Sequence, residues 1–182
     1  MKIDWQHIGI KDLAALVSRK LDENDIDALI VGGACVSIYT RNKYLSSDID
    51  FISHASLKDI SKALAELGFK RESSRHFERK ACPFFIEFVS PPAAIGEEPL
   101  KEKAELRTRY GKIALLTPTD STKDRLSAYY HWNDPQALEQ ALMVAKAQRV
   151  NLKEVERWSV KEGQKEKYDV FAQRLRKKDK KS

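Results

Sequence analysis

The most informative segment of this sequence is LIVGGACVSIYTRNKYLSSDIDF, residues 29–51. It begins with a short run of branched apolar residues, as expected for a buried β-strand, and this run ends at Gly32 and Gly33. A short helix is predicted next, and Asp48 and Asp50 then flank one isoleucine in a second predicted strand. Because aspartate is depleted in strands, this placement indicates a chemical role for the pair.

The two aspartates are spaced to bind cations. Alternate side chains of a strand share one face, so Asp48 and Asp50 point the same way from Cα atoms about 6.6 Å apart. Carboxylates at this spacing can flank two metal ions about 3.5–4 Å apart. Oxygen ligands suit Mg²⁺, which retains waters and accepts substrate phosphates as further ligands.

The paired glycines stand at a predicted strand-to-helix turn. There, backbone N–H groups without side chains can approach a phosphate, helped by the helix N-terminus behind them. A plain tight turn explains the glycines equally well, and the lysine of a P-loop and the third glycine of a dinucleotide fold are both missing. The glycines and aspartates together are more specific than either pair alone.

The rest of the chain predicts a mixed α/β half and then a helical part. Apolar spacing predicts a helix over residues 11–21, and a capping box at Ser56 opens another. PFFIEFVS (residues 83–90) is a predicted strand, residues 96–109 are expected to be a polar connection, and KIALLT (residues 112–117) is a further strand. The expected organisation is an α/β core over residues 1–117, a helical part packed on it over 118–176, and a basic disordered tail over 177–182.

Composition and charge narrow the function classes. Hydrophobic residues make up 42% and charged residues 33% of the chain, which is typical of a soluble globular protein. No apolar run approaches the roughly 18 residues of a membrane span. The amino terminus lacks the apolar core of a signal peptide, and two cysteines fit a reducing compartment. We therefore expect a cytoplasmic protein with no membrane partner.

The net charge of +6 does not indicate a nucleic-acid surface. Residues 171–182 contain six Lys or Arg and one Asp, so this end alone accounts for +5. A basic end of this kind is more often a solvated tail than a nucleic-acid arm. Nucleic acid is therefore left open as a partner but is not favoured.

Residues 31–51 resemble the signature of the DNA-polymerase-beta-like nucleotidyltransferase superfamily. That signature is an apolar residue with Gly-Gly or Gly-Ser, a short helix, and Asp-apolar-Asp on the next strand. The family's third carboxylate, more often an aspartate, lies on a later strand, where Glu87 stands here. The segment PTDSTKDRLSAYYHWNDPQALEQA further resembles minimal bacterial nucleotidyltransferases, including the AbiEii-type toxins, with Lys123 and Asp134 at their lysine and acid. The resemblance covers residues 28–145.

This resemblance implies a mixed β-sheet with flanking helices and a C-terminal helical segment. It also implies transfer of a nucleoside monophosphate (NMP) from a nucleoside triphosphate (NTP) to an acceptor hydroxyl, with two Mg²⁺ ions. The implied catalytic and metal-binding residues are Asp48, Asp50 and Glu87. The implied nucleotide-binding residues are Gly32, Gly33, Ser47 and Lys123.

Each of the less specific site residues has a simpler explanation. Ser47 can cap a turn, Glu87 can stand on an exposed strand face, and Lys123 can form a surface pair with a neighbouring aspartate. Asp134 is explained as a helix N-cap before proline.

Two classes of function remain. The first is an active nucleotidyltransferase whose acceptor is a small molecule, a protein or an RNA end. The second is a non-catalytic nucleotide-binding or toxin–antitoxin-type module on the same fold, with a partner protein and a weak link to phage defence. Retention of three acids favours the enzyme, but the fold does not identify the acceptor.

Overall fold

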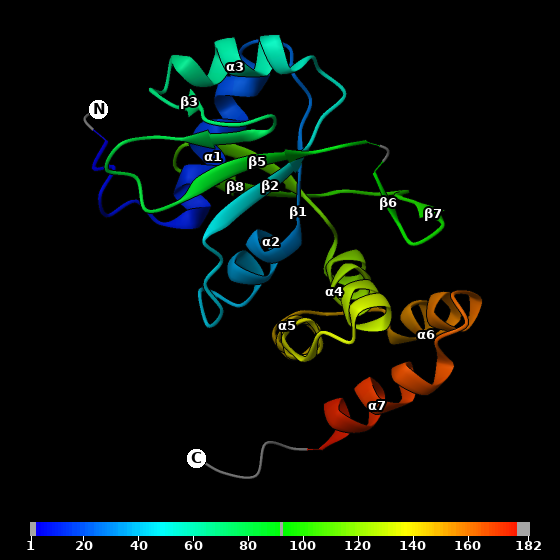
Figure 1. Ribbon diagram of the computed structural model, residues 1–182. Coiled ribbons are helices and arrows are strands. Elements are labelled where there is room, and N and C mark those ends of the chain that lie inside the picture. The colour runs from blue at the N-terminus through cyan, green and yellow to red at the C-terminus, as the bar shows by residue number, and fades with distance from the viewer. Residues whose placement is uncertain (1–2, 92, 178–182) are drawn as a thin grey trace.

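The computed structural model describes residues 3–91 and 93–177. Its centre is a mixed seven-stranded sheet with the strand order β3-β4-β5-β2-β1-β9-β8 (Figure 1). The strands of this sheet are β1 Leu29–Val31, β2 Asp48–Ile52, β3 Lys70–Arg71, β4 His76–Glu78, β5 Phe85–Val89, β8 Ala104–Thr108 and β9 Gly111–Leu115. A separate two-stranded hairpin is formed by β6 Ala94–Ile95 and β7 Glu98–Pro99.

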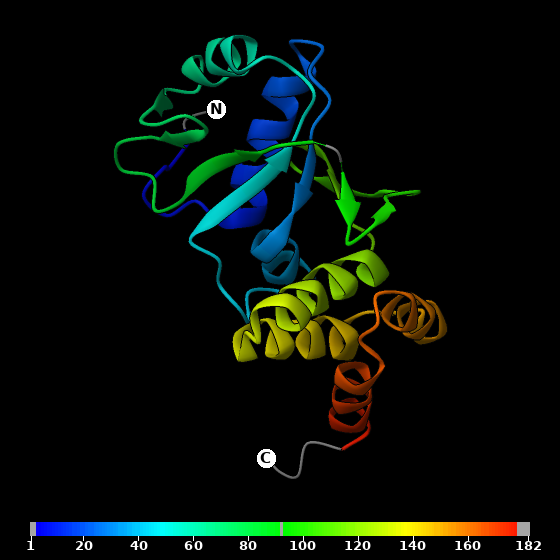
Figure 2. The same ribbon diagram turned by 45° about the vertical axis from the view of Figure 1, so that its right-hand side comes forward.

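The described residues contain seven helices. They are α1 Ile10–Asp22, α2 Gly32–Tyr39, α3 Leu57–Ala65, α4 Pro118–Trp132, α5 Pro135–Ala147, α6 Leu152–Lys161 and α7 Lys165–Arg176. Helices α4 to α7 lie together beyond α2, apart from α1 and α3, in both Figure 1 and Figure 2. The fold is thus the predicted mixed α/β sheet with flanking helices and a C-terminal helical segment.

Strand β2, which was predicted as a strand, occupies the middle of the sheet. It pairs antiparallel with β1 and parallel with β5. Its residues alternate, with Ile49 and Phe51 fully buried and the aspartates between them only half-buried. Phe51 stacks on Phe88 of β5 with ring centroids 5.5 Å apart, so the apolar face of both strands is held against the core. The opposite face of β2 is left to the carboxylates.

Helices α3, α5 and α6 begin at capped N-termini, and the caps of α3 and α5 were predicted. The hydroxyl of Ser56 accepts from the backbone N–H of Asp59 at the start of α3. Asp134 and Asn151 cap α5 and α6 in the same manner. These caps satisfy N–H groups that have no partner within the helix.

The expectation of a polar connection over residues 96–109 is wrong. This segment includes β7 and the edge strand β8, which pairs antiparallel with β9. Within β8, Glu105 and Arg107 are exposed while the alternate residues are half-buried. The charged residues in the segment concealed a two-residue alternation that is typical of a strand with one exposed face.

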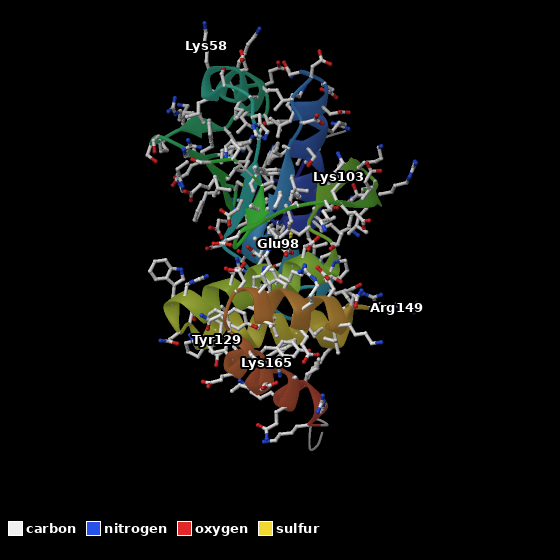
Figure 3. All side chains as sticks on the ribbon, turned by 90° about the vertical axis from the view of Figure 1, so that its right-hand side faces the viewer. Lys58, Glu98, Lys103, Tyr129, Arg149 and Lys165 are labelled. Carbon is white, nitrogen blue, oxygen red and sulfur yellow. The ribbon has the colours of Figure 1, made fainter. Side chains whose placement is uncertain are left out.

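Two groups of apolar side chains are buried, one around the sheet and one among helices α4 to α7. The β6–β7 hairpin is fixed to the helical group: the Trp158 indole donates to the carbonyl of Ile95 at 3.2 Å, and Glu98 accepts from Arg157 and Lys161. Figure 3 shows Glu98 between the sheet and these helices. The division of the chain at residue 117 stays a prediction, and the proposed tail falls almost wholly outside the described residues.

None of the described helices combines the length and apolarity needed to cross a membrane.

Candidate active site

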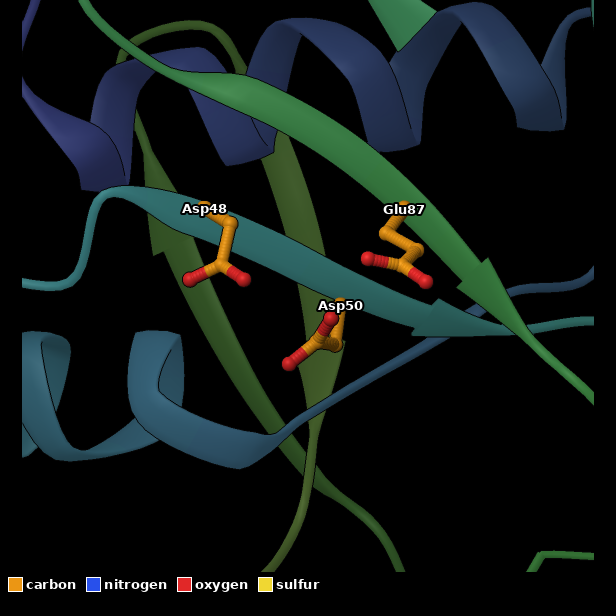
Figure 4. A group of neighbouring side chains, drawn as sticks. All are labelled: Asp48, Asp50 and Glu87. Carbon is orange, nitrogen blue, oxygen red and sulfur yellow. The ribbon is translucent and has the colours of Figure 1, made fainter. Parts of the chain in front are cut away.

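Three carboxylates converge on one face of the sheet. Asp48 and Asp50 come from β2, and Glu87 comes from the adjacent parallel strand β5, where it lies directly opposite Asp50. One oxygen of each carboxylate lies within 4.8 Å of one oxygen of each of the others. Figure 4 shows the three side chains pointing into a common space beside the start of α2. The fold therefore brings together the three acids that the sequence singles out.

The electrostatics of this cluster favour a cation. Burial and, to a lesser extent, the negative charges of Asp48 and Glu87 together raise the pKa of Asp50 to about 7. The positive charge of Arg125 opposes this effect. Three carboxylates without nitrogen or sulfur ligands form the donor set that Mg²⁺ prefers, so the residues present fit this ion.

Both glycines make room for side chains of the site. Gly32 has φ +67°, and a Cβ placed there would lie 2.5 Å from Oδ2 of Asp50. A Cβ on Gly33 would lie 2.7 Å from the hydroxyl of Ser46. A larger residue at Gly32 therefore collides with Asp50, and one at Gly33 collides with Ser46. Gly32 also adopts a conformation that other residues rarely adopt. The phosphate contact of the two glycines stays a prediction.

Ser46, which sequence reasoning missed, supports the cluster directly. Its buried hydroxyl donates to Oδ1 of Asp48 at 2.8 Å, and its backbone N–H donates to the Ser37 hydroxyl at 2.9 Å. The predicted residue, Ser47, is exposed, and its carbonyl accepts from the N–H of Phe85 at 3.3 Å. The spacing of residues 46, 48 and 50 could have indicated this role of Ser46, because alternate residues of an extended chain point to the same side.

Lys123 lies in a different cavity from the carboxylates. Its buried ammonium group pairs with Glu154 at 2.7 Å and lies 3.7 Å from Asp120. These residues line a cavity of about 470 Å³ between α4, α6 and the β6–β7 hairpin. Asp134 serves as the α5 cap, accepting from the N–H of Gln136 at 2.8 Å. The nucleotide-binding role of Lys123 stays a prediction.

Asp124 and Arg125 of α4 instead lie near Asp50, one of the three carboxylates. With Gly32 and Asp50 they line a cavity of about 320 Å³, whose remaining walls are mainly apolar. This position could not be predicted from the sequence, because the rotation of a packed helix decides which of its consecutive residues faces a site. The site is thus built from β2, β5, the start of α2 and the first half of α4.

One family model matches part of the chain. Residues 10–72 match a sequence model of the family described as "Nucleotidyl transferase of unknown function (DUF2204)". No curated protein sequence matches the chain significantly.

Two solved structures share the fold. One is an antigenic nucleotidyltransferase-like protein from Paracoccidioides brasiliensis, with a TM-score of 0.54 at 16% identity over 74% of each chain. The other is the antibiotic-resistance factor ANT(2'')-Ia, with a TM-score of 0.55 at 12% identity over 91% of this chain and 95% of that one. The chain therefore shares its fold with these two proteins, and residues 10–72 additionally match the nucleotidyl transferase family model.

Proposed function

We propose that this protein is a magnesium-dependent nucleotidyltransferase that moves an NMP group from an NTP to an acceptor hydroxyl. The observation that carries the proposal is the convergence of Asp48, Asp50 and Glu87 within 4.8 Å, beside a glycine turn shaped around one of them. Three acids in one partly buried cluster repel one another, so a purely structural role does not explain their arrangement.

The metal would be held by Asp48, Asp50 and Glu87. When bound, Mg²⁺ neutralises phosphate charge and stabilises the charge that develops in phosphoryl transfer. The protein itself then contributes by positioning the three carboxylates. The Ser46 hydroxyl fixes one carboxylate oxygen of Asp48, and the missing side chain at Gly32 leaves space for Asp50.

In the proposed reaction the acceptor oxygen attacks the α-phosphorus of the NTP. The bond from the α-phosphorus to the oxygen bridging the α- and β-phosphates breaks, and pyrophosphate leaves with that electron pair. Glu87 takes the proton of the acceptor hydroxyl, because its carboxylate stands at the edge of the cluster on a different strand from the aspartates. Gly32, Gly33, Ser47 and Lys123 are the sequence-predicted nucleotide contacts.

Transfer of label to an acceptor tests this proposal. The protein is incubated with each α-³²P-labelled NTP, Mg²⁺ and fractionated cell extract, and labelled small molecules, proteins and RNA are separated. We expect label in one fraction with the parent protein and none with Asp50→Asn or with EDTA. Transfer that persists in Asp50→Asn would contradict the assignment of the carboxylates.

The alternative is a nucleotide-binding module without turnover, and the same experiment distinguishes it. Metal-dependent NTP binding without labelling of any fraction would favour the module. A cytoplasmic location, a bacterial toxin–antitoxin or phage-defence setting, and a partner protein all stay predictions from the sequence.

A further inference from the structure

Helix α4 presents three consecutive charged residues to two different cavities. Lys123 lines the cavity between α4, α6 and the hairpin, whereas Asp124 and Arg125 line the smaller cavity with Gly32 and Asp50. Successive residues of a helix are rotated by about 100°, so neighbouring side chains can point to separate sites. Among the described residues that line the smaller cavity, Arg125 is the one cation.

The bonding of Arg125 leaves part of its guanidinium unused. Nε and Nη2 both donate to the same oxygen of Asp124, at 2.9 and 2.6 Å, and Nη1 donates to the Gln140 side-chain carbonyl at 3.3 Å. Among the described residues, these bonds engage three of the five N–H donors of a guanidinium. The Arg125 side chain is only 20% exposed, so its charge is largely removed from water.

This arrangement is a poor structural bridge. Asp124 is the preceding residue of the same helix, so its bond to Arg125 joins no two elements of the fold. Residues one apart in a helix do not normally face each other. The one bond from Arg125 to another element, to Gln140 of α5, is long at 3.3 Å.

We propose that Arg125 is a phosphate-binding residue for the NTP, and that Asp124 holds its guanidinium at the cavity until the nucleotide binds. This inference rests on the proposed nucleotidyltransferase function. A guanidinium matches phosphate oxygens through paired N–H groups, and such charge-assisted bonds are strong where water is excluded.

The charges around the cavity require such a cation. The three carboxylates carry three negative charges when ionised, Asp124 adds a fourth, and a triphosphate brings about four more. Metal ions offset the cluster, but the phosphates also need a fixed positive group. Lys123 is held by Glu154 in the other cavity, which leaves this role to Arg125.

Calorimetry on variants of the full chain tests the inference. Mg²⁺ complexes of ATP, CTP, GTP and UTP are titrated into the parent, Arg125→Gln and Arg125→Lys, and the tightest-binding NTP is followed. We expect Arg125→Gln to weaken that binding by about 10-fold or more, with partial recovery in Arg125→Lys. The matched control is Arg109→Gln, an exposed arginine paired with Asp12 on the far element α1, which should bind as the parent does.

Two further measurements separate phosphate binding from a structural role. Magnesium tripolyphosphate has no base or sugar, and Arg125→Gln should weaken its binding by the same factor as NTP binding. Asp124→Asn removes the carboxylate that competes with phosphate for the guanidinium, so it should bind NTP a few-fold more tightly than the parent. If Asp124→Asn weakens NTP binding as much as Arg125→Gln does, the pair acts as a structural unit and the inference is wrong.

The inference and the proposed function fail differently. NTP binding by Arg125→Gln at parental affinity would overturn the phosphate role of Arg125 while leaving the carboxylate site intact. Metal-dependent NTP binding that survives in Asp50→Asn would instead overturn the proposed function.

Discussion

Replacing Asp50 with asparagine should stabilise the metal-free protein. The change keeps the shape of the side chain and removes one charge from the cluster. The pKa of Asp50 is raised from 3.8 to about 7 by burial and by its acidic neighbours. At about 1.36 kcal/mol per pH unit, this difference corresponds to about 4 kcal/mol of destabilisation when Asp50 is ionised. Asp50 is partly exposed, so solvent screening reduces the gain to about 1–2 kcal/mol.

The stability that Asp50→Asn gains over the parent must increase as the pH rises. Below pH 3.8 Asp50 is protonated in the folded and unfolded chains, so the substitution changes little. Between pH 3.8 and about 7 the unfolded chain releases this proton while the folded chain retains it, and the parent therefore loses stability as pH rises. Above about pH 7 the penalty is complete, and the advantage of Asp50→Asn reaches its maximum.

Thermal melts in EDTA at pH 4 and pH 8 check this expectation. At pH 8 Asp50→Asn should melt about 2–8 °C above the parent, and at pH 4 the two should nearly coincide. Asp12→Asn is the control, since Asp12 pairs with Arg109 at 2.5 Å and its loss should lower the melting temperature slightly. A lower melting temperature for Asp50→Asn at pH 8 would refute the argument, because it would mean that the carboxylate stabilises the fold.

Two other substitutions test the geometry of the site. Glu87→Gln should leave NTP affinity within a few-fold and reduce transfer by about 100-fold, measured as pyrophosphate release with the identified acceptor; unchanged transfer would make Glu87 an ordinary surface residue. Gly32→Ala places a Cβ 2.5 Å from Asp50 and should abolish metal-dependent NTP binding in calorimetry. Its control is Gly163→Ala, because Gly163 has φ +70° and no atom lies within 4 Å of the added Cβ. In thermal melts this control should show only the backbone cost of about 1–2 kcal/mol. Equal effects of the two glycine variants on stability and binding would show that contact with Asp50 is unimportant.

The sequence predicted the central part of the site because strand geometry is regular. Alternation along β2 placed Asp48 and Asp50 on one face, and the structure puts Ile49 on the buried face between them. The role of Glu87 was predicted from the resemblance to the nucleotidyltransferase signature. The approach of Glu87 to Asp50 depends on the register of β2 with β5, a non-local pairing that the local pattern does not specify.

The remaining site residues depend on tertiary packing. Lys123 and Arg125 are both cationic residues of one predicted helical segment, so the sequence does not distinguish them. The rotation of α4 against the sheet decides which of the two lines the cavity with Asp50. Ser46 lies in the turn before β2, where the backbone path decides which of two adjacent serines reaches Asp48. Strand β8 was missed for a different reason, since its charged residues outweighed its alternation in the sequence.

Calorimetric titration of the parent with the four NTPs, with and without Mg²⁺, tests the central claim most directly. Three clustered carboxylates repel a triphosphate unless a cation lies between them. We predict that at least one NTP binds in the presence of Mg²⁺ and that EDTA abolishes this binding. Binding of no NTP in the presence of Mg²⁺, or equal binding with and without it, would contradict the claim that Asp48, Asp50 and Glu87 form a metal-dependent nucleotide site.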